Sequence, residues 1–141
     1  MMDGKVVAIT GSNIGIGKET AVALASMGAP VVLACRTQDK AAAAASDVRE
    51  RSGNDDVHVV RLDLADLATV RACAEEIKRL WTRLDVMINN AGGIWTERRT
   101  TVQGFEQTFG VNHLGHFYLT ALLPHWRAGR VASGCAAALA A

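Results

Sequence analysis

The chain has 141 residues, of which 50% are hydrophobic and 21% charged, and its formal net charge is +1. This length and composition fit one globular domain and exclude two domains of ordinary size. The near-neutral charge argues against nucleic acid or an anionic membrane as a partner recruited by bulk electrostatics. No apolar run approaches the roughly 20 residues that a membrane span needs, so we expect a soluble, cytoplasmic protein with no nucleic-acid or membrane partner.

A glycine-rich segment separates a predicted strand, residues 5–9, from a predicted helix, residues 15–27, which stops at Gly28. Glycine lets the backbone approach an anion closely, and the free N–H groups of a helix N-terminus point at that anion. The segment therefore predicts a phosphate site, although a tight strand-to-helix turn needs glycine for steric reasons alone. The candidate cofactor-binding residues of this turn are Gly11, Ser12, Asn13, Ile14, Gly15, Ile16 and Gly17.

The spacing of this turn excludes two other nucleotide-binding motifs. Lys18 is followed by Glu19 instead of Ser or Thr, which excludes a P-loop. The glycine spacing also departs from the G-x-G-x-x-G of dehydrogenases with the longer fold. Residues 10–17 instead resemble the Thr-Gly-x-x-x-Gly-Ile-Gly turn of the short-chain dehydrogenase/reductase family, in particular its retinol-dehydrogenase-like, NADP-dependent members.

The second predicted strand, residues 30–35, is a continuous apolar run of the kind found in parallel sheets covered on both faces. About 20 residues beyond the glycine turn, an acidic residue would bind the ribose 2′-hydroxyl of NAD. Cys35 and Arg36 occupy that place. A cation suits a 2′-phosphate, so we expect NADP(H) to be favoured over NAD(H); the alternative is that Arg36 is an exposed loop residue. Residues 37–52 then predict an alanine-rich packing helix that ends at Gly53.

An acidic residue follows the third predicted strand, residues 57–62. Asp63 stands just past the carboxyl end of this strand, where open α/β sheets bind ligands. Asp63 and Leu64 resemble the acidic dipeptide of the family that contacts the adenine ring. The alternative is that Asp63 or Asp66 caps the next helix. Apolar residues at spacings of three and four predict that this helix covers residues 67–84.

The fourth predicted strand, residues 85–89, runs into Asn90, Ala91 and Gly92. Side-chain amides at the end of a strand can satisfy neighbouring backbone groups, and small residues leave room for a flat cofactor. By itself this segment predicts a turn. After the fourth strand of a βαβαβαβ series it resembles the Asn-Asn-Ala-Gly signature of the family, which implies that Asn90, Ala91 and Gly92 contact the cofactor.

A long helix is predicted over residues 101–123, with Asn112 between Gly110 and Gly115. Each glycine inside a helix costs about 1 kcal/mol relative to alanine, so a kink or a function is implied. Residues 109–116 resemble the family segment whose asparagine helps to hold a water in a proton relay. The resemblance makes Asn112 the catalytic candidate; the alternative is a polar helix residue that faces solvent.

The histidines and cysteines predict neither a metal site nor a disulfide. His113 and His116 are three residues apart, but no acidic or cysteine ligand accompanies them at a recognised spacing. Cys35, Cys73 and Cys135 show no pairing pattern, so we expect reduced, buried thiols.

The resemblance covers about residues 3–124. A complete member would continue into a fifth strand with a catalytic serine and then a Tyr-x-x-x-Lys pair. The single tyrosine, Tyr118, has Leu122 four residues later, and Lys78 is the last lysine. Ser133 is a candidate remnant of the serine strand, although the run before it is short. Residues 125–141 predict an irregular tail rich in Ala and Gly, and we expect a premature end, through a shifted reading frame or a natural short form.

These observations predict a truncated, Rossmann-type, doubly wound α/β/α fold with a parallel sheet in the order 3-2-1-4. Residues 1–124 would form an incomplete NAD(P)-binding domain, and the fourth strand would be an open edge. The resemblance implies NADP-dependent hydride transfer between a nicotinamide and a small-molecule carbonyl or alcohol, and a homo-oligomer for a complete member. Without the Tyr-x-x-x-Lys pair, this chain is expected to be inactive. The alternatives are a non-catalytic NAD(P)-binding module and a fragment without a function of its own.

Overall fold

The computed structural model describes residues 1–123 and 130–133. Its strands are β1 (Val7–Thr10), β2 (Val31–Cys35), β3 (Val57–Arg61), β4 (Val86–Asn89) and β5 (Arg130–Ser133). Its helices are α1 (Gly15–Ser26), α2 (Gln38–Ser52), α3 (Leu67–Leu80), α4 (Gln107–Phe109), the π-helical turn η1 (Gly110–Leu114) and α5 (Gly115–Leu122). In this described part, no helix combines the length and the apolar composition needed to cross a membrane.

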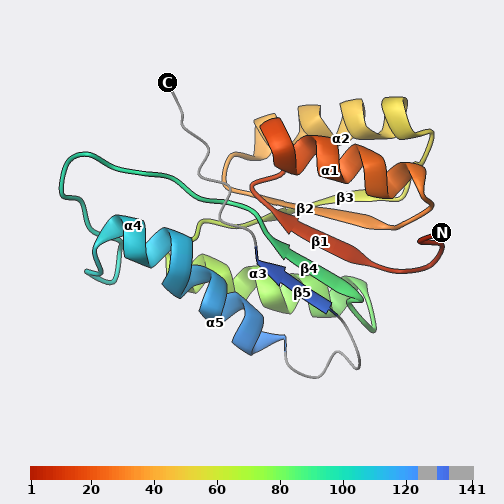
Figure 1. The fold of residues 1–141 in the computed structure, drawn as a ribbon. Coiled ribbons are helices and arrows are strands. Elements are labelled where there is room, and N and C mark those ends of the chain that lie inside the picture. The colour runs from red at the N-terminus through yellow and green to blue at the C-terminus, as the bar shows by residue number, and fades with distance from the viewer. Residues whose placement is uncertain (124–129, 134–141) are drawn as a thin grey trace.

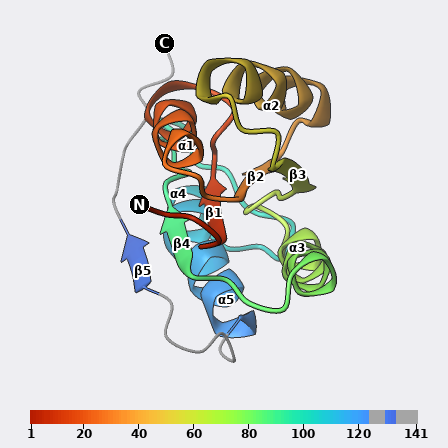
Figure 2. The same cartoon turned by 90° about the vertical axis from the view of Figure 1, so that its right-hand side faces the viewer.

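The strands form one parallel sheet in the order β3-β2-β1-β4-β5. Helices α1 and α2 cover one face, and α3 and α5 cover the other, so the molecule has three layers (Figures 1 and 2). Alternate residues of a strand point to opposite faces of the sheet. In β1, Val7 and Ile9 pack against the alanines of α1 and α2, whereas Ala8 packs toward α3 and α5. The predicted doubly wound fold and the order 3-2-1-4 are confirmed.

The sheet differs from the prediction at one edge. β5 lies beside β4 in parallel register, from Val86 opposite Arg130 to Asn89 opposite Ser133. The expectation that β4 is an open edge is therefore wrong, and four residues of the expected irregular tail form a strand. A run of four residues is too short to show a period in the sequence, and its strand state depends on pairing with β4.

Helix α3 is shorter than its apolar period predicts. It ends at Leu80, and Trp81 has an extended backbone with φ −133° and ψ 151°. Leu84 is buried, and Trp81 packs against the same apolar cluster as α3. The pattern thus predicted correctly which residues face the core, and it was wrong about the helical state of the last ones.

The helix predicted from residue 101 begins at Gln107. Before it, Thr100 and Glu106 form an antiparallel bridge around a turn in which Gly104 has φ +84°. The Glu106 carboxylate then accepts hydrogen bonds from the N–H groups of Thr108 and Phe109, at 2.8 and 2.9 Å. This local cap, which the apolar period does not reveal, sets the start of the helix.

Candidate functional site

The turn between β1 and α1 leaves open space at the N-terminus of a helix. Gly15 has φ +55°, and a Cβ atom built on it would meet nothing within 4 Å. Ile14 at the N-cap supplies no side-chain hydrogen bond to the first turn of α1, and the side chains of Ile14 and Ile16 are exposed. N–H groups without a side-chain cap, beside an open glycine, suit a phosphate group.

The other glycines of the turn are required by close packing against the segment after β4. A Cβ atom at Gly11 would lie 2.8 Å from Cα of Ala91. At Gly17, it would lie 2.5 Å from Nδ2 of Asn90. The structure therefore brings together the two sequence motifs, about 80 residues apart, that were singled out for cofactor binding.

The side chain of Asn90 joins these motifs by hydrogen bonds. Its Nδ2 donates to the carbonyl oxygens of Thr10 and Gly11, at 2.9 and 3.2 Å. The predicted use of an amide at the strand end, to satisfy neighbouring backbone groups, is confirmed. Ala91 and Gly92, which follow, are half-buried. The amide of Asn90 is thus committed to holding the end of β4 against the glycine turn.

Ser12 faces the interior of the protein. Its side chain is fully buried, donates to the carbonyl of Ile9 at 2.8 Å and lies 3.6 Å from Sγ of Cys35. Burial raises the pKa of the Cys35 thiol, an effect that the hydrogen bond to Ser12 partly offsets. Ser12 can therefore contribute to a ligand site through its backbone, whereas Asn13 is half-buried at the surface of the turn.

Arg36 follows β2 directly and is exposed. Within the described residues its side chain forms no hydrogen bond or ion pair. Arg61, at the end of β3, lies opposite Cys35 in the sheet register and is also exposed. Two cations therefore stand at the carboxyl edge of adjacent strands; Arg36 was predicted from the sequence to bind the cofactor, and Arg61 was not.

The structure distinguishes the two aspartates that follow β3. Asp66 is the N-cap of α3 and accepts from the N–H of Ala68 at 3.0 Å, so the capping alternative is confirmed for this residue. Asp63 does not occupy the cap position: its Oδ1 accepts from the N–H of Ala65, and it stays half-buried at the strand end. Leu64 is buried.

Asn112 lies in the π-helical turn η1 and does not face solvent. Its Oδ1 accepts from the N–H of Gly93 at 2.9 Å, and its Nδ2 donates to the Gly93 carbonyl at 2.8 Å. Gly110 and Gly115 border this turn, whose π-helical type is frequent at functional sites. Gly115 has a steric role as well, since a Cβ there would lie 2.8 Å from the carbonyl oxygen of Leu64.

A buried contact that was not predicted from the sequence joins β1 to α5. Nε2 of His116 lies 2.8 Å from Oγ1 of Thr10, and its Nδ1 lies 3.1 Å from the carbonyl of Asn112. The same hydroxyl accepts from the N–H groups of Asn90 and Ala91, at 3.0 and 2.9 Å. Nothing in the local sequence indicates this pairing, because its partners are 106 residues apart.

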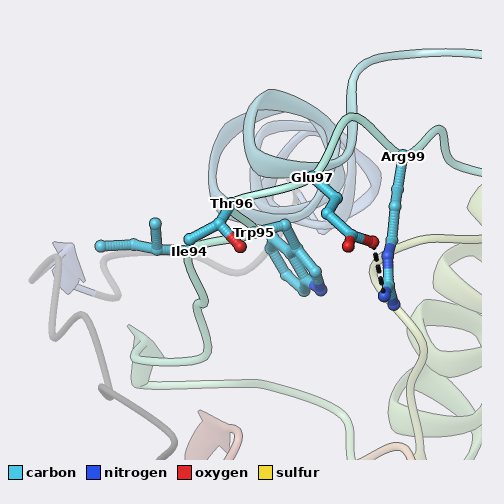
Figure 3. A pocket seen from close by; sticks show the side chains of 5 residues that line it. All are labelled: Ile94, Trp95, Thr96, Glu97 and Arg99. Carbon is cyan, nitrogen blue, oxygen red and sulfur yellow. Dashed lines mark ion pairs between the residues drawn. The ribbon is translucent and has the colours of Figure 1, made fainter.

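A hollow of about 240 Å³ opens in the loop that follows Gly93, lined by Ile94, Trp95, Thr96, Glu97 and Arg99 (Figure 3). The ring of Trp95 packs on Gly93, where a Cβ would lie 2.9 Å from it. The carboxylate of Glu97 faces the guanidinium of Arg99 at 3.5 Å. Through Gly93, this loop is attached to the side chain of Asn112.

The side chain of Tyr118 contacts α3. Its hydroxyl accepts from Nη2 of Arg71 in α3 at 2.7 Å, and the Arg71 guanidinium lies 5.9 Å from the centre of its ring. Ser133 is the last residue of β5 and lies opposite Asn89 in the register. Cys135 lies outside the described residues.

Among the described residues there is no group of three side chains that could hold a metal ion. His113 and His116 do not form a pair: His113 is exposed and packs between Phe109 and Phe117, whereas both ring nitrogens of His116 have protein partners.

Known proteins share both the sequence and the fold. A sequence model described as short chain dehydrogenase matches residues 5–134. Human (Homo sapiens) retinol dehydrogenase 13 is 50% identical over 120 residues, which are 85% of this chain and 36% of that protein. Mouse (Mus musculus) retinol dehydrogenase 12 is 52% identical over 120 residues, which are 85% of this chain and 38% of that protein.

Solved structures agree with these relatives. A putative uncharacterized protein from Mycobacterium paratuberculosis is 43% identical with a TM-score of 0.76, and the match covers 86% of this chain and 42% of that one. The Pseudomonas aeruginosa RhlG/NADP active-site complex is 28% identical with a TM-score of 0.78, covering 94% of this chain and 54% of the other. The family match reaches ten residues beyond the expected limit of 124, through β5. The chain belongs to the short-chain dehydrogenase family.

Proposed function

We propose that this chain binds NADP(H) along the carboxyl edge of its sheet and is the cofactor-binding half of an oxidoreductase. The observation that carries the proposal is the contact between the glycine turn and the segment after β4, in which Gly11 meets Ala91 and Gly17 meets Asn90. This contact leaves Gly15 open beside the first turn of α1, in the arrangement that a pyrophosphate requires.

Different residues along this edge would bind different parts of the cofactor. The backbone from Ser12 to Gly17 and the N-terminus of α1 would hold the pyrophosphate. Arg36 would pair with the 2′-phosphate, and Asp63 and Leu64 would contact the adenine. The wall formed by Asn90, Ala91 and Gly92 would lie against the nicotinamide half. When bound, the nicotinamide accepts or supplies the hydride.

The substrate class follows from the family and from the names of the relatives. Hydride transfer to or from a nicotinamide acts on a carbonyl or an alcohol. The relatives are named as retinol dehydrogenases, so retinol and retinal are the first compounds to test. The chain spans 36–40% of the length of these curated relatives, and the activity of a whole protein is therefore part of the proposal.

We also propose that the 141 residues do not reduce or oxidise such a substrate alone. A positioned general acid typically contributes 10²–10⁴-fold to the rate. The chain has no Tyr-x-x-x-Lys, and its one tyrosine, Tyr118, is bound to Arg71. We assign Asn112, in η1, as the remnant of the proton relay, and Ser133, at the end of β5, stays a candidate remnant of the serine strand.

A binding titration with matched glycine variants tests the cofactor site. Gly15 and Gly53 both have positive φ and open space around them, so an alanine strains the two positions alike. Gly15→Ala places a methyl group where the phosphate would lie, and we expect at least a tenfold loss of NADPH affinity; Gly53→Ala should keep it. An absence of saturable NADPH binding by the wild-type chain, or equal affinities for the two variants, would overturn the proposal.

A further inference from the structure

The hydroxyl of Thr10 is the centre of a buried hydrogen-bond network. Thr10 is fully buried and His116 is 6% exposed. Oγ1 of Thr10 accepts from the N–H groups of Asn90 and Ala91 and lies 2.8 Å from Nε2 of His116. A threonine hydroxyl has two lone pairs and one proton. The N–H of Ala91 and the N–H of Asn90, which is shared with the carbonyl of Ile88 at 3.0 Å, occupy the two lone pairs, so the hydroxyl proton is directed at His116.

This count fixes the protonation state of His116. To accept from Thr10, Nε2 must carry no proton, so Nδ1 carries the proton of the neutral ring. Nδ1 faces the carbonyl of Asn112 at 3.1 Å, which is a hydrogen-bond acceptor. Both ring nitrogens are therefore satisfied by a single tautomer, and this assignment follows from the network as a whole.

A protonated ring does not fit this network. An imidazolium would point an N–H from Nε2 at an oxygen whose lone pairs are already in use. Either one of the two backbone N–H groups or the ring would have to withdraw. Asn90 and Ala91 are the two residues of the wall that pack on Gly17 and Gly11. Their withdrawal would therefore loosen the packing between the wall and the glycine turn.

The surroundings of His116 favour the neutral form. Burial lowers the pKa of His116, and its hydrogen bond to Asn112 offsets this in part; no charged group contributes. Several charged or titratable groups of the elements that adjoin α5 have partners of their own or are exposed. Asp63 accepts from Ala65, Arg71 and Tyr118 bind each other, and His113 is exposed.

We propose that His116 is a positioning residue, whose neutral ring locks Thr10 and thereby holds the Asn90–Ala91 wall on the glycine turn, and whose protonation releases this wall. The consequence for cofactor affinity rests on the proposed function, whereas the release of the wall does not. Since the locked state excludes the proton, opening takes one up, and the lock weakens as the pH falls below the ordinary histidine value of about 6.5.

Hydrogen exchange of single amides tests the lock without any ligand. The amides of Asn90 and Ala91 are followed by NMR at pH 7.5 and 5.5, corrected for intrinsic exchange and compared with the core amide of Leu33. We expect their protection to fall several-fold, up to a limit of about tenfold, relative to Leu33 at the lower pH, and to fall more at Ala91 because the N–H of Asn90 also donates to Ile88. Ring ¹⁵N shifts at pH 7.5 should show a protonated Nδ1 and an unprotonated Nε2 on His116.

Two variants separate the lock from a general effect of acid. In His116→Gln, the amide oxygen can still accept from Thr10 but does not titrate, so protection of Asn90 and Ala91 should become independent of pH. His113→Gln, an exposed position in the adjoining turn η1, should behave like the wild type. Three results would overturn the inference: amide protection in the wild type that does not change with pH, a protonated Nε2 at pH 7.5, or a loss of protection at low pH that persists in His116→Gln.

The affinity for NADP⁺ over the same pH range connects the lock to the cofactor. The 2′-phosphate also titrates near pH 6, so the comparison is between the wild type and His116→Gln. Between pH 7.5 and 5.5, we expect the affinity of the wild type for NADP⁺ to fall by a factor at least three times larger than that of His116→Gln. If neither protein binds NADP⁺ at any pH, the proposed function fails and the exchange result still decides the inference; equal losses overturn the link to the cofactor.

Discussion

The side-chain amide of Asn112 forms two hydrogen bonds with the backbone of Gly93, one to its N–H at 2.9 Å and one from its nitrogen to the carbonyl at 2.8 Å. An asparagine carries its donor and its acceptor on separate atoms, so one side chain serves both the N–H and the carbonyl of a single residue. The pair fastens η1 to the start of the loop that carries Trp95 and the hollow of Figure 3. The residue expected to serve a proton relay thus also has a structural task.

This pair predicts the effect of Asn112→Ala. The Gly93 N–H and carbonyl would both lose their partner in a half-buried place, and we expect the free energy of unfolding to fall by about 1–3 kcal/mol. Urea denaturation measures it. Asn13→Ala is the control, because within the described residues the side chain of Asn13 forms no hydrogen bond. Equal, negligible effects of the two substitutions would contradict a structural role for Asn112.

A second prediction concerns Gly17→Ala. The new methyl group would lie 2.5 Å from Nδ2 of Asn90 and 2.7 Å from the carbonyl oxygen of Gly11, so the wall and the turn must separate. Overpacking of this kind costs about 1–3 kcal/mol, and NADPH binding should be lost with it. Thermal unfolding and titration measure both effects. A variant that keeps the wild-type stability and affinity would show that the contact is unimportant.

The third prediction tests the cofactor preference. Arg36→Ala should weaken NADPH binding by about tenfold or more and leave NADH binding nearly unchanged, because NADH lacks the 2′-phosphate. Arg61→Ala is the matched control, since Arg61 is exposed at the end of the adjacent strand. Fluorescence titration with both cofactors provides the comparison. Equal losses for NADPH and NADH would refute the assignment of Arg36 to the 2′-phosphate.

The cysteines give a fourth prediction. Cys35 and Cys73 are buried free thiols, as expected. Burial, together with the nearby Cys35, raises the pKa of Cys73 from 9.0 to about 12, so its thiolate fraction at pH 8 falls by about 1,000-fold. In a Cys135→Ser background, iodoacetamide should label neither thiol until urea unfolds the chain. Rapid labelling of Cys73 in the folded protein would show that α3 opens readily.

The fifth prediction is that the isolated chain does not catalyse the reduction of carbonyl compounds by NADPH. Absorbance at 340 nm would follow NADPH in the presence of retinal and a panel of aldehydes and ketones, with Tyr118→Phe as the control. We expect the rate of the buffer blank for both proteins, because the chain lacks a general acid activated by a lysine. Turnover that survives repurification, and that Tyr118→Phe abolishes, would show that Tyr118 replaces the missing acid.

The sequence by itself determined the elements whose signals are local. Short apolar runs gave four strands, and a parallel sheet with right-handed crossovers left the order 3-2-1-4 as the natural arrangement. The glycine turn was predicted to be a phosphate site, and the resemblance to the family signature assigned the Asn90–Gly92 segment to the cofactor. A helix cap at Asp63 or Asp66 was an open alternative from the sequence, and the structure assigns it to Asp66.

The tertiary structure decided what depends on contacts between distant residues. β5 is a strand because β4 lies beside it, and Trp81 leaves α3 although its apolar spacing continues. The pairing of Thr10 with His116 joins residues 106 positions apart. A period in the sequence reports which face of an element is apolar, whereas the partner of a buried polar group is set by which elements the folded core brings within hydrogen-bond distance.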